Sequence, residues 1–261
     1  MPRALLFEIP LGKKLGNISG MSYSLLVNGA PMNSNAVIKI VPSLLSADFA
    51  HLADDIARAE AAGCRIFHLD VMDGHFVPNL TIGPVVAAAV RKATRSYLAA
   101  HLMVEKPEMF LKPFAETGVE EIVIHEEIEA DWVAVLEEIR RLGLKAGVSI
   151  RPKTPVARLQ RGLAAADTIL IMSVEPGFGG QEYIAGSERK VEEACALARS
   201  AGKEIAIEID GGITPRTAPL AARAGATRLI AGSAVFRGDV AENVRRLRAA
   251  IQGIGKVSPA P

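Results

Sequence analysis

The chain has 261 residues, of which 49% are hydrophobic, 23% charged and 5% aromatic, and its formal net charge is +1. This globular composition with balanced charge offers no electrostatic basis for binding nucleic acid or an anionic membrane surface, so we expect neither partner. No apolar run approaches the roughly 18 residues that span a bilayer. Together with two widely spaced cysteines that lack metal-ligand spacing, this favours a cytoplasmic protein.

The first 36 residues are typical of an appendage and not of a domain. Gly, Asn, Ser and Pro interrupt them, and no helix or strand periodicity is sustained. Met21 and Met32 leave open that the natural start lies downstream. We therefore expect an irregular N-terminal extension over 1–36, one domain over 37–252 and a short C-terminal tail over 253–261.

From residue 38 onward, short apolar runs alternate with turn residues and Ala-rich helical segments. Eight strands are predicted, at 38–43, 66–70, 97–103, 121–125, 145–150, 168–173, 205–210 and 228–232. Strand-helix alternation implies parallel strands joined by right-handed crossovers. Eight such units fit an α/β fold with a single (β/α)8 TIM barrel, and the first turn lacks the GxGxxG of a dinucleotide-binding sheet.

Two of the intervening helices carry clear end signals. The segment 48–63 begins at a possible N-cap, Asp48, and stops at Gly63. The segment from Asp131 to Gly143 carries one apolar stripe, which indicates a helix packed on a sheet.

Ionisable residues gather at the predicted ends of three strands. His68 and Asp70 are two residues apart, so both side chains can face the barrel axis. His101 lies near the end of the next strand, and Asp210 ends the seventh. Because barrel active sites lie at the C-terminal strand ends, the four are expected to meet. Two imidazoles and two carboxylates suit one divalent ion, Zn²⁺, Fe²⁺, Mn²⁺ or Co²⁺.

A single polar residue inside a barrel is more often hydrogen-bonded structure than a ligand, and only the convergence of four favours a metal. His51, on the first predicted helix, is expected to be a helix-surface or packing residue. His75 and His125 stay undecided, since either could support the site without contacting a metal.

Glycine-rich turns follow strands six, seven and eight, at 175–181, 210–212 and 231–236. Their backbone amides could hold a phosphate, which barrels often bind there. Three methionines, Met72, Met103 and Met172, fall at the same strand ends and could line a dry pocket.

With these residues assembled, the chain resembles the ribulose-phosphate 3-epimerase family over about Ile38 to Arg248. The stretches that carry the resemblance are PSLLSADFAHL, HLDVMDGHFVPNLTIGP, HLMVEKPE, MSVEPGFGGQ, EIDGGI and AGSAVF. It implies an isomerase that interconverts D-ribulose 5-phosphate and D-xylulose 5-phosphate, in the pentose phosphate pathway or the Calvin cycle. Barrels of this kind commonly form homo-oligomers, so a homo-oligomer is expected.

The resemblance also implies roles for individual residues. The metal would be held by His68, Asp70, His101 and Asp210, with Asp70 and Asp210 also acting as the acid/base pair. Substrate would be contacted by Ser43, His101, Gly177, Phe178, Gly179, Gly180, Asp210, Gly211, Gly212, Gly232 and Ser233.

The sequence departs from the family pattern at three positions. Ala99 stands where an Asp usually precedes the strand-three histidine, which would loosen the surroundings of His101. Ile82 and Lys153 replace a common Phe and a common small residue.

Three other functions stay open at this stage. The same chemistry could act on allulose 6-phosphate, which needs only more room. A lyase or decarboxylase on a related phosphate-binding barrel is a different reaction class, and a phosphosugar-binding protein without turnover is a third.

Overall fold

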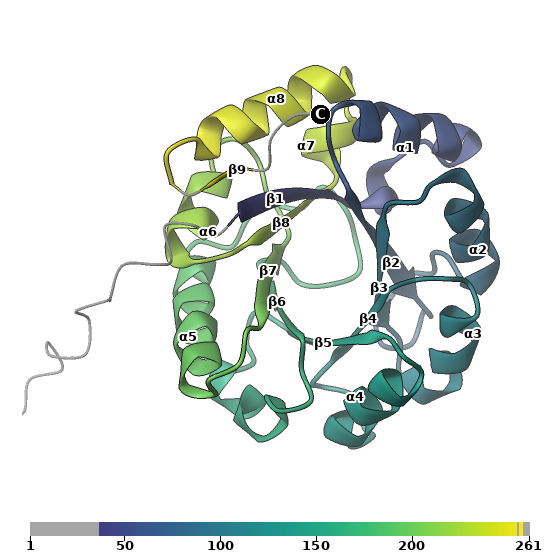
Figure 1. Cartoon of the computed structure of the whole chain (residues 1–261), viewed down its shortest axis with the longest axis vertical. Coiled ribbons are helices and arrows are strands. Elements are labelled where there is room, and N and C mark those ends of the chain that lie inside the picture. The colour runs from purple at the N-terminus through teal and green to yellow at the C-terminus, as the bar shows by residue number, and fades with distance from the viewer. Residues whose placement is uncertain (1–36, 255, 258–261) are drawn as a thin grey trace, which may run out of the picture. The chain divides into compact units, whose positions relative to one another are not determined.

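Eight parallel strands form the wall of a barrel in the computed structural model, which describes residues 37–254 and 256–257 (Figure 1). The wall consists of β1 (Val37–Pro42), β2 (Ile66–Met72), β3 (Tyr97–Met103), β4 (Glu121–His125), β5 (Lys145–Ile150), β6 (Thr168–Met172), β7 (Ala206–Asp210) and β8 (Arg228–Ala231). Neighbours pair in chain order from β2 to β8, and β8 pairs with β1. A bridge between Ser43 and His68 brings β1 back to β2. The predicted single TIM barrel is confirmed.

Helices surround the strands as an outer ring (Figure 1). They are α1 (Leu52–Ala61), α2 (Pro84–Ala93), α3 (Leu111–Ala115), α4 (Trp132–Arg141), α5 (Ser187–Ser200), α6 (Ala218–Ala224), α7 (Ser233–Phe236) and α8 (Val240–Ile251). Short 3₁₀ turns are η2 (Leu44–Ser46), η3 (Phe49–His51), η4 (Pro107–Met109) and η5 (Val156–Gly162). None of the helices in the described part of the chain is long and apolar enough to cross a membrane.

The two expected helix starts turn out differently. Asp131 caps α4 as predicted, accepting a hydrogen bond from the amide of Val133. Asp48 instead caps η3, accepting from the amide of Ala50. His51 then leaves helical geometry with φ −131°, so α1 begins only at Leu52. The backbone break divides what the sequence presents as one helix.

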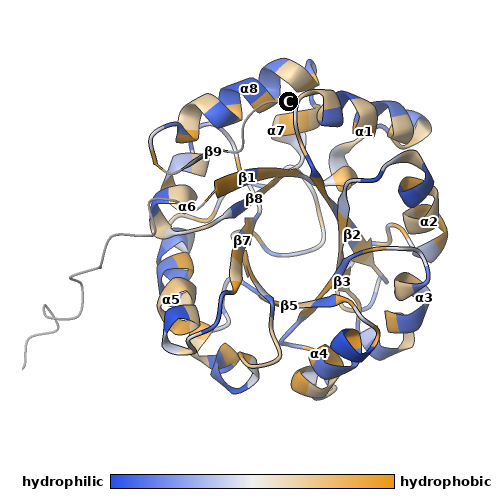
Figure 2. Cartoon of the chain, in the orientation of Figure 1, coloured by the Kyte–Doolittle hydropathy of each residue, from blue (hydrophilic) through white to orange (hydrophobic). Residues whose placement is uncertain are grey.

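Strand alternation separates two apolar layers. On β2, Phe67, Leu69 and Val71 face outward and join the large core between wall and helices. A smaller core inside the barrel contains Val41, Ile66, Val123, Leu170, Met172, Val174 and Ile230. In Figure 2 the helices carry both hydrophobic and hydrophilic residues, as expected of elements that cover a core with one face. The inward positions of β2 beyond Ile66 are His68, Asp70 and Met72.

The end of the described chain adds one more strand. β9 (Lys256–Val257) runs parallel to β1 and pairs with its first two residues, Val37 and Ile38. The extension expected over 1–36, and residues 255 and 258–261 of the expected tail, lie outside the described residues.

Candidate active site

Two histidines and two aspartates converge at the C-terminal strand ends. His68 and Asp70 lie on β2, His101 on β3 and Asp210 at the last position of β7. Asp70 pairs in register with His101 across the two neighbouring strands. One nitrogen or oxygen atom of each side chain lies within 4.8 Å of one such atom of every other. The structure thus brings together the four residues that were predicted from the sequence to share a site.

The interior of this cluster contains buried polar atoms without partners. His68 and His101 are fully buried, and Asp70 is only 4% exposed. Within the described part of the chain, both ring nitrogens of His68 and Nδ1 of His101 are without a hydrogen-bond partner. Asp70 Oδ1 lies 3.3 Å from Nδ1 of His68 and 3.7 Å from Nδ1 of His101. Buried polar groups of native proteins are normally satisfied, so these residues fit a divalent ion.

The four side chains perturb one another's pKa values. Burial opposes ionisation of Asp70, yet the imidazoles of His68 and His101 outweigh it and hold the Asp70 pKa well below its usual range. Burial and the charge of Asp70 raise the pKa of Asp210 to about 7. Burial alone would lower the His68 pKa, but Asp70 and Asp210 raise it to about 9. Burial lowers the pKa of His101 to about 3.

Ser43 follows β1 and reaches the same cluster. Its Oγ donates a hydrogen bond of 2.7 Å to Asp70 Oδ2. That bond orients the carboxylate and leaves Oδ1 turned toward the histidines. Ser43 thus contacts the proposed acid/base residue directly, in addition to lining the pocket described next.

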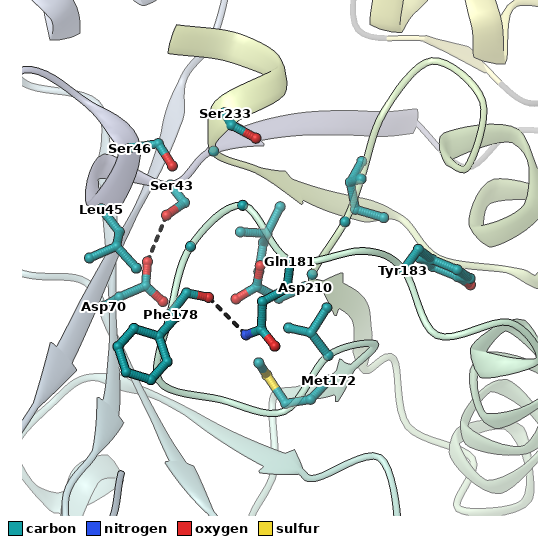
Figure 3. Close-up of a pocket in the computed structure, with 18 of the residues that line it drawn as sticks. Ser43, Leu45, Ser46, Asp70, Met172, Phe178, Gln181, Tyr183, Asp210 and Ser233 are labelled. Carbon is teal, nitrogen blue, oxygen red and sulfur yellow. Dashed lines mark hydrogen bonds between the residues drawn. The ribbon is translucent and has the colours of Figure 1, made fainter. Parts of the chain in front are cut away.

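A pocket of about 330 Å³ opens above the cluster (Figure 3). Among the residues named from the sequence, its lining includes Ser43, Asp70, Met72, Met103, Met172, Gly177, Phe178, Gly179, Gly180, Asp210, Gly211, Gly212, Gly232 and Ser233. His68 and His101 are absent from this lining. Both histidines are fully buried. Of the four residues, only Asp70 and Asp210 line the pocket.

Glycines allow three loops to approach this pocket closely. A Cβ on Gly212, whose φ is +60°, would lie 2.3 Å from the backbone nitrogen of Tyr183. A Cβ on Gly232 would lie 2.4 Å from Ser46 Oγ. By contrast Gly180, with φ +74°, faces open space and needs glycine only for its backbone conformation. Close packing of the β7 loop on the β6 loop, and of the β8 loop on η2, therefore accounts for part of the glycine pattern.

The loop after β6 covers one side of the pocket. Gln181 Nε2 donates to the carbonyl oxygen of Phe178 (Figure 3) and to that of Glu175, so the loop is closed on itself. Asn79 Nδ2, from the loop after β2, donates 2.7 Å to the carbonyl of Gly177. The Phe178 side chain is 56% exposed. The loop is held by bonds within itself and by one bond from the β2 loop, and it is exposed at Phe178.

The remaining histidines fall into distinct surroundings. His51 is exposed, as predicted. His75 is exposed too, beside Asp73, whose carboxylate accepts from the amides of His75, Phe76 and Glu105 and joins the β2 and β3 loops. His125 is fully buried, with its Nε2 2.9 Å from that of His101. Of the two undecided histidines, only His125 reaches the site.

Several pocket residues were not predicted from the sequence, among them Ser46, Gln181, Thr214, Arg216 and Thr217. All lie in segments that directly follow a strand, which is the one signal that could have found them. Ala99 lies opposite His68 in the β2–β3 register. The Asp that is usual in the family at this position would therefore lie beside His68 more than beside His101.

A TIM barrel that gathers imidazoles and carboxylates beneath a pocket at its C-terminal strand ends has the organisation of an enzyme. The model of the ribulose-phosphate 3 epimerase family matches residues 39–236. The chain belongs to this family and is an epimerase.

Two similar relatives show how far the likeness extends. The ribulose-phosphate 3-epimerase of Bacillus subtilis (strain 168) is 44% identical over 201 residues, which cover 77% of this chain and 93% of that protein. A cytoplasmic isoform from Oryza sativa subsp. japonica, also called ribulose-phosphate 3-epimerase, is 41% identical over 227 residues, covering 85% and 98%.

Solved structures of lower identity share the fold alone. KGPDC from Streptococcus mutans superposes with a TM-score of 0.62 at 14% identity, covering 84% of this chain and 99% of its own. Phosphoribosyl anthranilate isomerase from Thermus thermophilus gives 0.60 at 18%, covering 82% and 98%.

Proposed function

We propose that the protein interconverts D-ribulose 5-phosphate and D-xylulose 5-phosphate by inverting C3 through an enediolate. The observation that carries the proposal is the meeting of Asp70 and Asp210 with two histidines beneath one pocket. The named relatives support the choice of substrate. The catalytic unit is proposed to be the barrel over 37–252, and assembly into a homo-oligomer stays a prediction.

In this proposal His68, Asp70, His101 and Asp210 hold one divalent ion, Zn²⁺, Fe²⁺, Mn²⁺ or Co²⁺. Their nitrogen and oxygen donors suit such ions, and two carboxylates balance the charge of the ion inside a buried site. A bound ion would stabilise the negative charge of the enediolate as it develops.

The chain's own carboxylates move the proton. Inversion at C3 requires removal of a proton from one face and its return to the other, which one carboxylate cannot easily do. Asp70 on β2 and Asp210 on β7 come from separate parts of the barrel wall. One acts as base and the other as acid, and the roles exchange with reaction direction. The Ser43 hydroxyl keeps Asp70 oriented through its 2.7 Å hydrogen bond.

The glycine loops bind the phosphate in this proposal. Gly177, Gly179, Gly180, Gly211, Gly212, Gly232 and Ser233 line the pocket above the aspartates. Amides in glycine turns and at the start of a helix stabilise an anion, and anchoring the phosphate orients C3. The loop over 175–183 excludes water from the intermediate, with Phe178 at its exposed tip and Met72, Met103 and Met172 keeping the pocket floor dry.

A substrate comparison on metal-defined enzyme tests the function. After exhaustive chelation we expect no turnover, and addition of Zn²⁺, Fe²⁺, Mn²⁺ or Co²⁺ should restore it. The restored enzyme should show a kcat/KM for ribulose 5-phosphate at least about tenfold above that for allulose 6-phosphate, because a pocket built for five carbons discriminates by fit. Solvent deuterium should enter C3 during turnover.

Each part of this result has a contrary outcome. Equal or better use of allulose 6-phosphate would assign the enzyme to hexulose phosphates. Full activity without metal would remove the ion from the proposal. Tight binding of ribulose 5-phosphate without turnover or deuterium uptake would leave a phosphosugar-binding protein.

A further inference from the structure

A short hydrogen-bond chain extends from the metal-ligand cluster through His101 to residues beyond it. His101 Nε2 lies 2.9 Å from His125 Nε2, and the two rings are stacked with centroids 4.9 Å apart. On the other side of its ring, His125 Nδ1 lies 3.0 Å from Oε2 of Glu127. His125 ends β4, next to β3, and Glu127 follows it by two residues; in the β3–β4 register His101 lies opposite Val123, two residues before His125.

Glu127 is itself held in one orientation. Its Oε1 accepts a hydrogen bond of 2.7 Å from the backbone amide of Arg151, which leaves Oε2 for His125. The Phe76 ring packs on His125 with centroids 4.8 Å apart, and the Arg151 guanidinium lies 4.2 Å above the Phe76 ring. The chain of hydrogen bonds is therefore enclosed by loops from three different strands.

Counting protons fixes the direction of these bonds. An ionised carboxylate only accepts, so Nδ1 of His125 carries the proton that faces Glu127. A neutral His125 then has its lone pair on Nε2 and can only accept there. Because two ring nitrogens 2.9 Å apart share one proton, His101 is the donor through Nε2. The lone pair of His101 is left on Nδ1, which faces Asp70 Oδ1 at 3.7 Å.

The opposite direction is less favourable on two counts. It would need a cationic His125 that donates from both nitrogens, in a fully buried position next to a ring stacked under the Arg151 cation. It would also place a proton on His101 Nδ1, where 3.7 Å is too long for a hydrogen bond to Asp70.

We propose that His125 and Glu127 are positioning residues that fix His101 in its Nε2–H tautomer, so that the Nδ1 lone pair faces the cluster of His68, Asp70 and Asp210. The consequence for metal binding rests on the proposed function. Neither residue contacts the pocket, since both are absent from its lining. His68 has no equivalent, because within the described residues neither of its ring nitrogens makes a hydrogen bond.

The tautomer can be measured directly. In the metal-free full-length protein, long-range ¹H–¹⁵N correlation resolves the ring nitrogens of the five histidines, and a His101→Gln variant assigns the His101 signals. We expect a protonated Nε2 and an unprotonated Nδ1 on His101. A proton on Nδ1 of His101 would overturn the proposal.

The substitution Glu127→Gln should reverse the donor and acceptor roles in this series of hydrogen bonds while keeping the size and shape of the side chain. The Gln carbonyl oxygen would keep the hydrogen bond from the Arg151 amide, and its amide group would then donate to His125 Nδ1. His125 would donate from Nε2 to His101, and the His101 proton would move to Nδ1. We expect this tautomer in the spectrum, and a divalent-ion affinity reduced about 10–100-fold in competition with a chromophoric chelator.

His75→Gln is the matched control. His75 ends no strand, is exposed, and bonds through Nδ1 to the carbonyl of Asp73 in its own loop. Its replacement should leave both the His101 spectrum and the Zn²⁺ and Co²⁺ affinities at wild-type values. Unchanged affinity and an unchanged His101 tautomer in Glu127→Gln would overturn the proposal.

Failure of the proposed function gives a different pattern. If the wild-type protein bound no divalent ion, the metal-dependent epimerase would fail, whereas the His101 tautomer in metal-free protein would still decide for or against the positioning role. If the wild-type protein bound metal and turned over, only the behaviour of Glu127→Gln would be at issue.

Discussion

Asp70 and Asp210 carry the same functional group in different surroundings. Asp70 is 4% exposed, accepts from Ser43 and faces two imidazoles, which hold its pKa below the usual range. Burial and, after it, the charge of Asp70 raise the pKa of Asp210 to about 7. Two carboxylates with separated proton affinities are the usual arrangement of an acid/base pair.

Asp210→Asn tests this pair at the level of one residue. The amide keeps the shape of the side chain but cannot exchange the C3 proton. We expect kcat for epimerisation to fall at least about 100-fold, the lower end of what general acid–base catalysis contributes. Deuterium exchange into one of the two epimers should fall less, because Asp70 still serves one face.

Asp239→Asn controls for the loss of a carboxylate. Asp239 caps α8 by accepting from the Glu242 amide, and Asn is an equally good cap, so turnover should be unchanged. Near-normal turnover in Asp210→Asn would remove that residue from the proposed acid/base pair.

Strands β3, β4, β7 and β8 share a buried ionic cluster below the site. Arg228 Nη1 on β8 donates 2.8 Å to Glu121 Oε2 and 2.7 Å to Glu208 Oε1. The Tyr97 hydroxyl donates 3.0 Å to the same oxygen of Glu121. Both glutamates are at most 1% exposed. The guanidinium of one arginine therefore bonds two buried carboxyl groups, one from β4 and one from β7.

Arg228→Met should therefore destabilise the barrel strongly. Removing one partner of a buried ionic group leaves uncompensated charge, which costs about 3–5 kcal/mol. Urea unfolding followed by circular dichroism measures the loss. Adding Glu121→Gln and Glu208→Gln to the same chain should recover part of it, since both charges are then gone.

Arg245→Met is the comparison for a surface pair. Arg245 bonds Glu242 on α8, and both side chains are well exposed, so the free energy of unfolding should fall far less than in the Arg228 variant. Equal stability of the Arg228 and Arg245 variants would show that the buried cluster contributes no more than a surface ion pair.

At the scale of the whole molecule, the barrel is complete within the described residues. The described residues form one compact unit, and the family model begins at residue 39. β1 begins at Val37 and pairs with β8 from Lys39 onward and with β9 at Val37 and Ile38. Within the described residues, the wall, the outer helices and the pocket are built from residues 37–251.

A chain that begins at Asn33 tests this organisation. We expect its thermal unfolding midpoint and its epimerase turnover to equal those of the full chain, as for an N-terminal extension that contributes nothing to the barrel. A chain that begins at Val41 is the control. It loses four of the six residues of β1, with the whole β9 pairing and half of the β8 pairing, and should unfold at a lower temperature. Lost turnover in the Asn33 chain would assign the extension a functional part.

Much of the site could be predicted because strand geometry is local. The alternation that places His68 and Asp70 on one face follows from backbone pleating alone, as does the outward direction of Phe67 and Leu69. The same parity, extended two residues back from Asp210, would also have indicated that Glu208 faces the interior. Strand ends were predicted within about two residues, the usual precision of boundaries.

Other features depend on which strands lie next to one another. The proton chain from Glu127 to His101 needs β3 beside β4, and Arg228 meets Glu121 only because the barrel closes across its own interior. No local pattern specifies such contacts between residues 107 positions apart in sequence. The break between η3 and α1 lies at His51, whose φ is −131°, and no sequence pattern marked it.

By itself, the sequence determined the eight strand-helix units, the barrel they imply and the four residues expected to share a metal, because periodicity and strand parity act over a few residues. Only the tertiary structure decided that His125 belongs to the site and His75 does not, since the sequence left both histidines undecided. The physical reason is that the role of a histidine depends on the hydrogen-bond partners of its two ring nitrogens. For His125 these partners are His101 on β3 and Glu127 in the loop after β4.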